Sequence, residues 1–372
     1  MSMIIEKLPS GDEVHRYQRC LVVPFDGKRK VMSTSMHNGG YREDLTGIYN
    51  HDVNPSFGKS CDYYEYGKEG DEKHKRFIEE KLGLDFEKTA YMATIVSMDN
   101  AAISTHIYDE LAVTAVSTAS VELNGGRAGD PATSYERRGE SILLNPGTIN
   151  IMIFVNADMT PGCMARAIVT ATEAKTAVLQ ELLAGSMRSS GIATGTGTDN
   201  IMIIANSESD NLLTYAGKHG KLGELIGLTA METVRQSLER HMGLSAKSQH
   251  NVFARLERFG VTEESFINGL NRMQAGRNVP QFMDNVHKIS ADGKVLALTS
   301  LYVHLLDQLR WGMIMPEEAV SSGELLLDNI AAQFEYQRLQ EEAPSLIADK
   351  CVDAMLERYV SEIIVAALYL PH

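Results

Sequence analysis

The stretch from Gly191 to Asn206 carries the groups that a small-molecule site needs. It reads GIATGTGTDNIMIIAN, so a loop of glycines and threonines runs into an apolar, β-branched segment. Glycine lets the backbone approach a ligand closely, and threonine adds short hydroxyl groups. Asp199 ends the loop with a carboxylate. We therefore predict the floor of an active site here, with a binding loop made of Gly195, Thr196, Gly197 and Thr198.

Two phosphate-binding motifs do not fit this loop. A dinucleotide fingerprint would continue from Gly195 and Gly197 to a third glycine and a helix, whereas Asn200 and a strand-like segment follow. The loop contains no Gly-Lys-Ser/Thr, which excludes a P-loop at this position. The structural alternative is a tight entry into a strand, in which the threonines satisfy local backbone groups.

Lys175 occupies the apolar stripe of a predicted helix. Thr160 is a typical N-cap, Pro161 suits the first helical position, and the pattern extends to about Leu183. At about 100° per residue, Lys175 shares one face with the apolar residues Met164, Ile168, Ala171, Val178 and Leu182. Because burying an unpaired ammonium is costly, Lys175 must extend to solvent, pair with a carboxylate or serve chemistry. Asp199 is the candidate partner.

Two further loops carry groups that could contact a ligand. Residues 124–130 read NGGRAGD, in which Arg127 and Asp130 either pair with each other across a turn or bind a ligand. Residues 36–41 read MHNGGY, in which Asn38 follows a predicted strand. A turn is the simpler interpretation of this second loop, and ligand contact through Asn38 is the alternative.

Polar residues also gather where a second long helix is expected to begin. The segment KHGKLGELIGLTAMETVRQSLERHM is predicted to become helical near Lys221. The polar residues at this start are Lys218, His219, Lys221 and Glu224. Lysines match the positive end of a helix dipole poorly, so an anionic or carbonyl-bearing ligand would explain them. The alternative is that they are simply solvated.

Two hairpins are predicted to support these loops. Residues 19–35 contain two short apolar runs joined at Asp26 and Gly27, a dipeptide typical of a two-residue type I′ turn. Residues 200–206 form a predicted strand, and residues 212–217 follow the polar turn SESDN as a second hairpin arm.

A central strand is predicted at residues 149–155. This run, INIMIFV, is apolar on successive residues, which is typical of a strand covered on both faces, and it follows a predicted turn at residues 145–147. Residues 111–123 are β-prone and small-sided, whereas residues 89–97 fit either a strand or a buried helix.

The remaining segments are predicted to be irregular or helical. Residues 42–75 are polar and weakly periodic, which predicts an irregular or partly helical excursion that could act as a lid. A short helix is predicted at residues 73–84, and apolar spacing is helical beyond about residue 245. The predicted C-terminal helices span residues 252–259, 263–273, 293–313, 317–340 and 345–370.

Length and composition indicate a soluble protein of two domains. The chain has 372 residues, of which 44% are hydrophobic and 23% charged, and its apolar runs are too short to cross a bilayer. The N-terminal residues show no leader pattern, so we expect a cytoplasmic protein. A formal charge of -14 opposes binding to nucleic acid or to anionic membranes. We therefore expect a small, neutral or cationic partner.

Cysteine and histidine spacing indicates neither a disulfide framework nor a zinc site. The cysteines at positions 20, 61, 163 and 351 form no CxxC pair. Histidines such as His37, His51, His106 and His219 show no HxxxH spacing. The predicted chemistry therefore requires no metal.

Six segments occur in a recognisable order. They are STSMHNGG (33–40), GRAGDPA (126–132), PGTINI (146–151), TATEAKTAVLQEL (170–182), SGIATGTGTD (190–199) and YAGKHGKLGELI (215–226). Together they resemble the adenosylcobinamide amidohydrolase family over about residues 20–240. This family hydrolyses an amide of adenosylated cobinamide to release adenosylcobyric acid in corrinoid salvage.

The resemblance implies a corrinoid amide as the substrate. Amide hydrolysis needs an activated nucleophile, a stabilised oxyanion and a proton for the leaving amine. We expect Asp199 to act as base or orienter, and Lys175 to stabilise the oxyanion together with N–H groups of residues 195–198. His219 or Lys221 would protonate the leaving aminopropanol nitrogen.

A covalent route through Thr196 or Thr198 is the competing mechanism. The residues expected to contact the substrate are Gly195, Thr196, Gly197, Arg127, Asp130, Asn38, Lys221 and Glu224. Cobalt would enter only as part of the corrinoid, so the resemblance implies no further cofactor.

The expected architecture is an α+β layered sandwich in residues 1–244, in which a mixed β-sheet packs with long helices at residues 160–184 and 221–242. An all-helical domain follows at residues 245–372 and could form a homodimer. One departure concerns residues 117–120, which read STAS where the family more often has Gly or Asn, so the substrate range could differ.

The altered strand and the helical domain also fit another class of protein, a corrinoid-binding or sensing protein that does not hydrolyse its ligand. A general Ser/Thr peptidase-like hydrolase is a third interpretation. It rests only on the threonine-rich loop and the order of the helices, which is analogy at the level of the fold.

Overall fold

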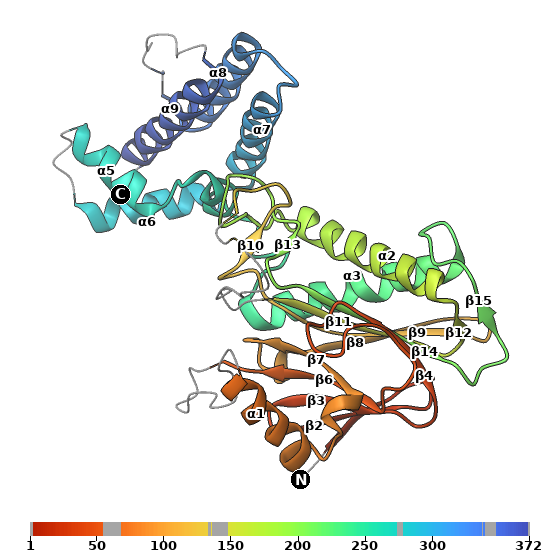
Figure 1. Cartoon of the computed structure of the whole chain (residues 1–372). Helices are drawn as coiled ribbons and strands as arrows, with labels where there is room; N and C mark the ends of the chain where they lie inside the picture. The colour runs from red at the N-terminus through yellow and green to blue at the C-terminus, as the bar shows by residue number, and fades with distance from the viewer. Residues whose placement is uncertain are drawn as a thin grey trace. The chain divides into compact units, whose positions relative to one another are not determined.

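The computed structural model describes residues 3–54, 68–132, 135, 148–273, 278–336, 338 and 347–370. The chain divides into two compact units, Met1–Ser245 and Ala246–His372. The first unit is built mainly from two large β-sheets and two long helices arranged in layers, and its described residues also form two short two-stranded ladders (Figure 1). The second unit is helical. The predicted α+β class with a helical C-terminal region is therefore confirmed.

A mixed six-stranded sheet forms the middle layer of the first unit, in the order β5-β4-β14-β11-β9-β8. β11 and β14 run parallel, and the other neighbouring strands are antiparallel. The strands are β5 (Gly40–Arg42), β4 (Arg29–Ser33), β14 (Asn200–Asn206), β11 (Ile149–Val155), β9 (Leu111–Ala119) and β8 (Ala102–Tyr108). The bounds of β11 and β14 agree with the strands predicted from the sequence.

β11 is the central strand because both of its faces are covered. Ile151 and Ile153 pack with the long helices α2 (Pro161–Glu181) and α3 (Lys221–Met242), whereas Met152 and Phe154 pack with the second sheet. This alternation follows from the two-residue period of a strand. The prediction of a doubly covered central strand is confirmed.

The second sheet has five strands in the order β1-β2-β3-β6-β7. Its strands are β1 (Met3–Lys7), β2 (Glu13–Tyr17), β3 (Cys20–Pro24), β6 (Gly47–Asp52) and β7 (Thr89–Thr94). One face contributes Leu21 and Ile48 to the core shared with the six-stranded sheet. The other face packs Tyr49 against the π-helix η2 (Phe77–Leu82). Residues 89–97, which the sequence left open, therefore contain a strand.

The two long helices begin where their sequence signals predict. Thr160 Oγ1 accepts a hydrogen bond from Cys163 N at 3.3 Å, and Pro161 is the first residue of α2. α2 ends slightly before the predicted Leu183, because Leu183 has a left-handed backbone with φ of 51°. α3 begins at Lys221 as expected.

Both predicted hairpins are wrong, although their strands exist. β3 pairs with β2 and β6, whereas β4 pairs with β14 and β5, so the turn at Gly27 carries the chain from one sheet to the other. Burying Val23 and Val31 in the core between the sheets stabilises this crossing. Likewise β15 (Leu212–Leu213) pairs in parallel with β12 (Asp158–Met159) rather than with β14.

The irregular excursion predicted at residues 42–75 is corrected in part. Its residues 47–52 are the fully buried strand β6, whose polar side chains find partners inside the fold. α1 (Lys68–Arg76) and η2 replace the single short helix predicted at residues 73–84. Residues 55–67 of the possible lid at 42–75 and the predicted turn at residues 145–147 lie outside the described residues.

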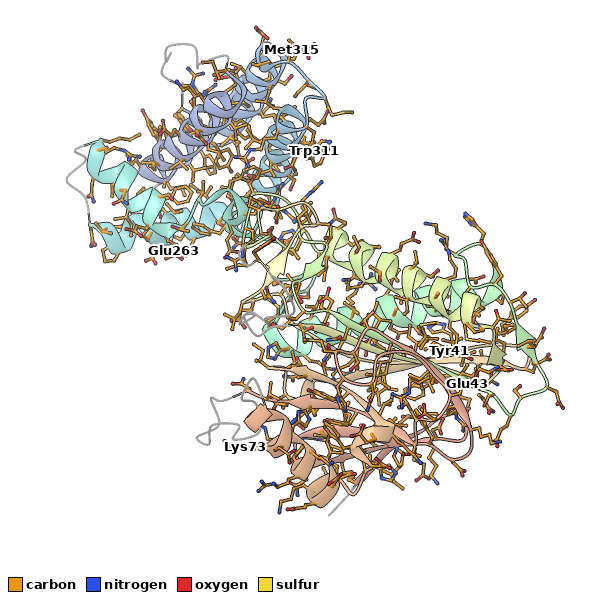
Figure 2. The ribbon with its side chains drawn as sticks, viewed as in Figure 1. Tyr41, Glu43, Lys73, Glu263, Trp311 and Met315 are labelled. Atoms are coloured by element: carbon orange, nitrogen blue, oxygen red, sulfur yellow. The ribbon has the colours of Figure 1, made fainter. Side chains whose placement is uncertain are left out.

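The second unit has its own apolar core. Its helices are α4 (Val252–Leu256), α5 (Glu263–Arg272), α6 (Val279–Ser290), α7 (Gly293–Arg310), α8 (Pro316–Gln333) and α9 (Ala348–Tyr369). α6 was not predicted. The exposed apolar side chains of Trp311 and Met315 lie at the turn between α7 and α8 (Figure 2). None of the helices in the described part of the chain is long and apolar enough to span a membrane.

Candidate active site

Several strand ends meet at one edge of the six-stranded sheet. β14 and β11 begin there in parallel register. β9 and β4 end there, because Ala119 pairs with Ile149 and Ser33 pairs with Met202. The loops at these strand ends therefore converge, although they come from distant parts of the sequence.

A short antiparallel ladder joins two of the loops predicted from the sequence. β10 (Gly125–Gly126) pairs with β13 (Gly195–Thr196), and Figure 1 shows this ladder beside the end of α2. Beyond the ladder, Ala128 N donates to Thr194 Oγ1 at 2.9 Å. The glycine-threonine loop and the NGGRAGD loop thus form one continuous backbone surface.

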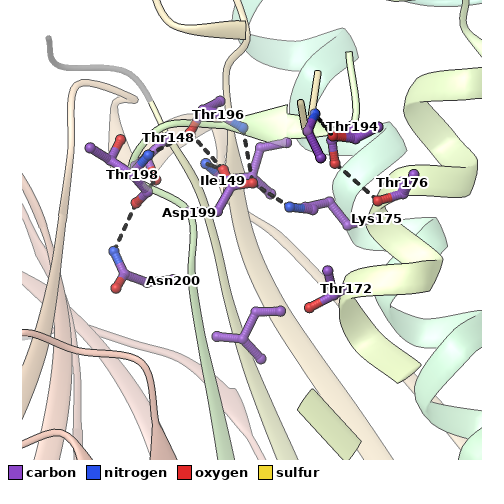
Figure 3. A network of polar contacts seen from close by, with 12 residues as sticks. Thr148, Ile149, Thr172, Lys175, Thr176, Thr194, Thr196, Thr198, Asp199 and Asn200 are labelled. Atoms are coloured by element: carbon purple, nitrogen blue, oxygen red, sulfur yellow. Dashed lines mark hydrogen bonds and ion pairs between the residues drawn. The ribbon is translucent and has the colours of Figure 1, made fainter. Parts of the chain in front are cut away.

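Lys175 and Asp199 form a buried ion pair at this edge. Lys175 Nζ contacts Asp199 Oδ2, and the two side chains are only 6% and 13% exposed. Figure 3 shows Lys175 reaching from α2 to the end of the glycine-threonine loop. A buried ammonium needs a counter-charge of this kind. The partner predicted for Lys175 is therefore confirmed.

The Asp199 carboxylate accepts hydrogen bonds on both oxygens. Oδ2 accepts from Lys175 Nζ and from Thr196 N, the latter at 3.0 Å. Oδ1 accepts from Thr196 Oγ1 at 2.6 Å and from Ile149 N at 3.0 Å. A carboxylate offers about four lone-pair sites, so these four donors engage all of them.

The two loop threonines have different partners. Thr196 Oγ1 donates to Asp199 and accepts from Thr198 N at 3.3 Å. Thr198 Oγ1 accepts from Asn124 Nδ2 at 3.3 Å. The hydroxyl group of Thr196 is therefore tied to the carboxylate, whereas that of Thr198 is tied to the neighbouring loop.

The loop glycines differ in the space around them. A Cβ atom on Gly195 would overlap Asp199 Oδ2 and lie 2.5 Å from Lys175 Nζ, so the backbone fits against the ion pair only without a side chain. A Cβ atom on Gly197 would meet nothing closer than Asn124 Oδ1 at 3.2 Å. Gly195 is thus the position at which the loop requires glycine.

Residues that the sequence analysis did not single out complete the site. Thr148 Oγ1 donates to the carbonyl of Thr198 at 2.5 Å and so ties the glycine-threonine loop to the residue that precedes β11. Asn150 Nδ2 donates to Asn50 Oδ1 at 2.8 Å and so links the two sheets. The available signal was a lone asparagine inside the apolar run INIMIFV, because a buried amide must find hydrogen-bond partners.

Arg127 and Asp130 form the predicted turn. Arg127 N donates to Asp130 Oδ2 at 2.8 Å, and Ser186 Oγ donates to the same oxygen at 2.6 Å. Burial alone would raise the pKa of Asp130, but hydrogen bonds from Ser186 and Ser189 outweigh burial and lower it. The Arg127 residue is exposed beside the loop, where ligand contact remains a prediction.

Asn38 is engaged by its own surroundings. Its backbone is left-handed, with φ of 52°. Its Nδ2 donates to the carbonyls of Phe86 and Thr89, each at 2.9 Å, and its Oδ1 accepts from Arg42 at 3.0 Å. These contacts match the simpler interpretation, a turn, and they leave the substrate contact expected of Asn38 without support.

Comparison with known proteins decides the family. The family model described as CbiZ, adenosylcobinamide amidohydrolase, matches residues 5–246. The chain belongs to the adenosylcobinamide amidohydrolase family. The resemblance identified from the sequence motifs is confirmed.

This family member is similar to one curated protein sequence, and one solved structure aligns with it weakly. An uncharacterized protein of Methanocaldococcus jannaschii is 34% identical over 232 residues, which cover 59% of this chain and 86% of that protein. The crystal structure of a protein from Pyrococcus horikoshii aligns with 12% identity and a TM-score of 0.31, over 70% of this chain and 91% of that chain. A likeness at that score supports no conclusion about fold or function.

In this adenosylcobinamide amidohydrolase family member, the groups at the start of α3 lie far from Asp199. Lys221 Nζ pairs with Glu224 at 2.6 Å and lies 4.4 Å from the Tyr108 ring centre. Tyr108 ends β8 where β9 begins, whereas Asp199 lies where β9 ends. The exposed His219 precedes α3 at that distant end. The length of β9 thus separates His219 and Lys221, the expected proton donors, from the ion pair of Lys175 and Asp199. It also separates the pair from the substrate contacts expected of Lys221 and Glu224.

The described residues of this family member offer neither a reactive cysteine nor a metal-binding cluster at the site. Cys20, Cys163 and Cys351 are buried and form no disulfide within the part of the chain that the structure describes, and burial raises the pKa of Cys163 to about 11, which keeps its thiol protonated at neutral pH. Among the described residues, no group of three or more His, Cys, Asp or Glu side chains could hold a metal ion. Cys61 lies outside those residues.

Proposed function

We propose that this protein hydrolyses an amide bond of adenosylcobinamide or of a related corrinoid, giving adenosylcobyric acid and aminopropanol. Membership of the amidohydrolase family over residues 5–246 supports the reaction class. The observation that carries the proposal is the buried pair of Lys175 and Asp199 beside a glycine-rich loop. Charged groups buried beside a half-buried loop of this kind are candidates for a functional site.

The pair and the loop supply the elements of amide hydrolysis. Lys175 provides a positive charge close to the backbone of Gly195, where the oxyanion of a tetrahedral intermediate would be stabilised. Asp199 receives the proton released when the nucleophile attacks. That nucleophile is either a water molecule or a loop hydroxyl group. The proposal needs no cofactor, since cobalt enters as part of the substrate.

The neighbouring loop supplies the binding wall. Arg127 and Asp130 lie on the loop that is paired with the glycine-threonine loop, so they flank the reacting bond. A formal charge of -14 disfavours strongly anionic substrates such as nucleic acid. A corrinoid amide presents apolar ring surface and polar amide groups, which suits a wall of backbone and mixed polar groups.

Incubation of the purified protein with adenosylcobinamide tests the proposal. Mass spectrometry should detect adenosylcobyric acid and free aminopropanol in equal amounts. Asp199→Asn should abolish product while the protein stays folded by circular dichroism. Corrinoid binding without any product would instead identify a binding or sensing protein, and full activity of Asp199→Asn would remove Asp199 from the reaction.

A further inference from the structure

We infer that the Thr196 hydroxyl group is the nucleophile of the proposed amide hydrolysis, and that the reaction passes through an ester on Thr196. The inference rests on the proposed function and chooses between its two routes. Its basis is the hydrogen bonding of Asp199, together with the partial exposure of Thr196.

Saturation of the carboxylate argues against direct activation of water. All of the roughly four lone-pair sites of Asp199 carry a donor in this structure. A water molecule therefore finds no free site on Asp199 at which to leave its proton. A proton can reach Asp199 readily only from a group that already donates to it. Among those donors, the Thr196 hydroxyl is the one that becomes an oxygen nucleophile when it loses the proton.

The Thr196 hydroxyl is oriented for this transfer. The 2.6 Å contact directs its hydrogen at Asp199 Oδ1, and the Thr198 N–H occupies one lone pair at 3.3 Å. A hydroxyl oxygen has two lone pairs, so one remains to form a bond with carbon. Thr196 is half-buried, whereas the Lys175 side chain beneath it is 6% exposed. Thr196, like Asp199, is therefore partly open to solvent, whereas Lys175 is buried.

The first step forms one bond and moves one proton. Thr196 Oγ1 attacks the amide carbonyl carbon while its proton passes to Asp199 Oδ1. The carbonyl oxygen becomes an oxyanion near Lys175 and the N–H of Gly197, an exposed residue whose N–H donates to none of the residues that the structure describes. The C–N bond then breaks, and the proton held by Asp199 passes to the leaving amine. The acyl group remains as an ester on Thr196.

Acylation itself opens the carboxylate to water. Once Thr196 Oγ1 is esterified, it no longer carries a hydrogen to donate, and the lone pair that it occupied on Asp199 Oδ1 becomes free. A water molecule can bind at this site, transfer its proton to Asp199 and attack the ester. Collapse of the second intermediate returns the proton to Thr196 Oγ1 and releases the acid. The two steps together consume one water molecule and one amide.

The test compares Thr196 with a threonine of α2 outside the binding loop, in the full-length protein. Thr196→Ala should lower kcat for adenosylcobinamide by at least roughly 100-fold, as loss of a nucleophile requires. Thr196→Ser should retain measurable turnover. Thr172→Ala, the matched control, should stay within about threefold of the wild type, because the exposed Thr172 hydroxyl donates to the carbonyl of Ile168 within α2 and has no contact with Asp199. Circular dichroism and thermal unfolding confirm that each variant folds.

Denaturing quench of the wild type during the first turnover supplies a readout that a structural role would not change. Intact-mass spectrometry should show an adduct of the adenosylcobyric acyl group, mapped to the peptide that contains Thr196 and absent from Thr196→Ala. Normal turnover of Thr196→Ala, or wild-type turnover with no adduct across that time course, overturns the inference and leaves the proposed function standing. A wild type that yields no product at all overturns both.

Discussion

Lys175 and Asp199 stand 24 positions apart in the sequence, yet their side chains meet in the interior of the first unit. Lys175 lies on the buried face of α2, and Asp199 lies at the start of β14. The helix therefore brings a positive charge to the sheet edge at which the loops converge. This single contact links the stability of the unit to its proposed chemistry.

Removing one charge of this pair should destabilise the protein strongly. Lys175→Met leaves Asp199 as a buried unpaired carboxylate, so the free energy of unfolding should fall by about 3 kcal/mol in urea denaturation. The double variant Lys175→Met/Asp199→Asn should recover much of this loss. Lys218→Met is the control, because Lys218 is 57% exposed in its pair with Glu173 and should change stability by less than about 1 kcal/mol. Equal losses at the two lysines would contradict the buried pair.

The two loop glycines should respond differently to alanine. Gly195→Ala places a methyl group against Asp199 and Lys175, so it should separate the pair and abolish hydrolysis of adenosylcobinamide. Gly197→Ala keeps the N–H of residue 197 and requires only a small shift of Asn124, which its Cβ atom would approach to 3.2 Å, so it should lose less activity than Gly195→Ala. Steady-state kinetics of both variants checks this, and similar losses at the two positions would argue against the close approach of Gly195 to the pair.

Acid should destabilise the first unit through His51. Burial, followed by the charges of His74 and Arg19, lowers the pKa of His51 from 6.5 to about 3. Between these two pH values His51 binds a proton in the unfolded chain but stays neutral in the folded chain. The contribution of His51 to the free energy of unfolding is therefore fully present above about pH 6.5 and is lost progressively as the pH falls toward about 3.

His51→Phe should remove this part of the acid sensitivity. Phenylalanine can keep the stacked contact with Phe77, in which the ring centres are 4.7 Å apart. From about pH 6.5 to about pH 5 the wild type should lose roughly 2 kcal/mol more than the variant in urea denaturation. Parallel losses in the two proteins would show that His51 does not stay neutral in the fold.

The hydrogen bond between the Asn50 and Asn150 amides, which links the two sheets, should stabilise the fold cooperatively with its neighbours. Asn150→Leu leaves Asn50 Oδ1 and the carbonyl of Ala93 without the donor that they share, so it should lower the free energy of unfolding by roughly 2 kcal/mol. Asn50→Leu should lower the free energy of unfolding by a similar amount, because Thr118 Oγ1 loses the donor Asn50 Nδ2 and Asn150 Nδ2 loses the acceptor Asn50 Oδ1. The double variant should cost less than the sum, since neither amide is left unpaired by its former partner. Strictly additive losses would contradict a shared network.

The sequence predicted those elements whose signals are local. Thr160 and Pro161 begin α2 as an N-cap and a first helical residue, and the apolar runs at residues 149–155 and 200–206 are strands with those bounds. The spacing of Lys175 placed it on the apolar face of α2, with solvent contact, pairing with a carboxylate or a chemical role as the open alternatives, and the structure shows the buried pair with Asp199. Caps and periodicity depend on neighbours along the chain, so they can be read without knowledge of the fold.

The pairing of strands from distant segments could not be predicted from such local signals. The dipeptide Asp26-Gly27 is compatible with a hairpin, but the strands that it joins enter different sheets because each buries its apolar face against the core between them. β6 was missed because Asn50, His51 and Asp52 are polar, and only their partners in the fold make their burial favourable.

For the candidate site, the sequence by itself determined the chemical groups: a carboxylate, a lysine among apolar neighbours, and a loop of glycines and threonines, together with the family motifs. Only the tertiary structure decided which groups meet. It joined Asp199 to Lys175 and Thr196, and it left His219 at the far end of β9. The physical reason is that strand order and helix packing set the distances between remote residues, whereas composition and spacing report only on neighbours within an element.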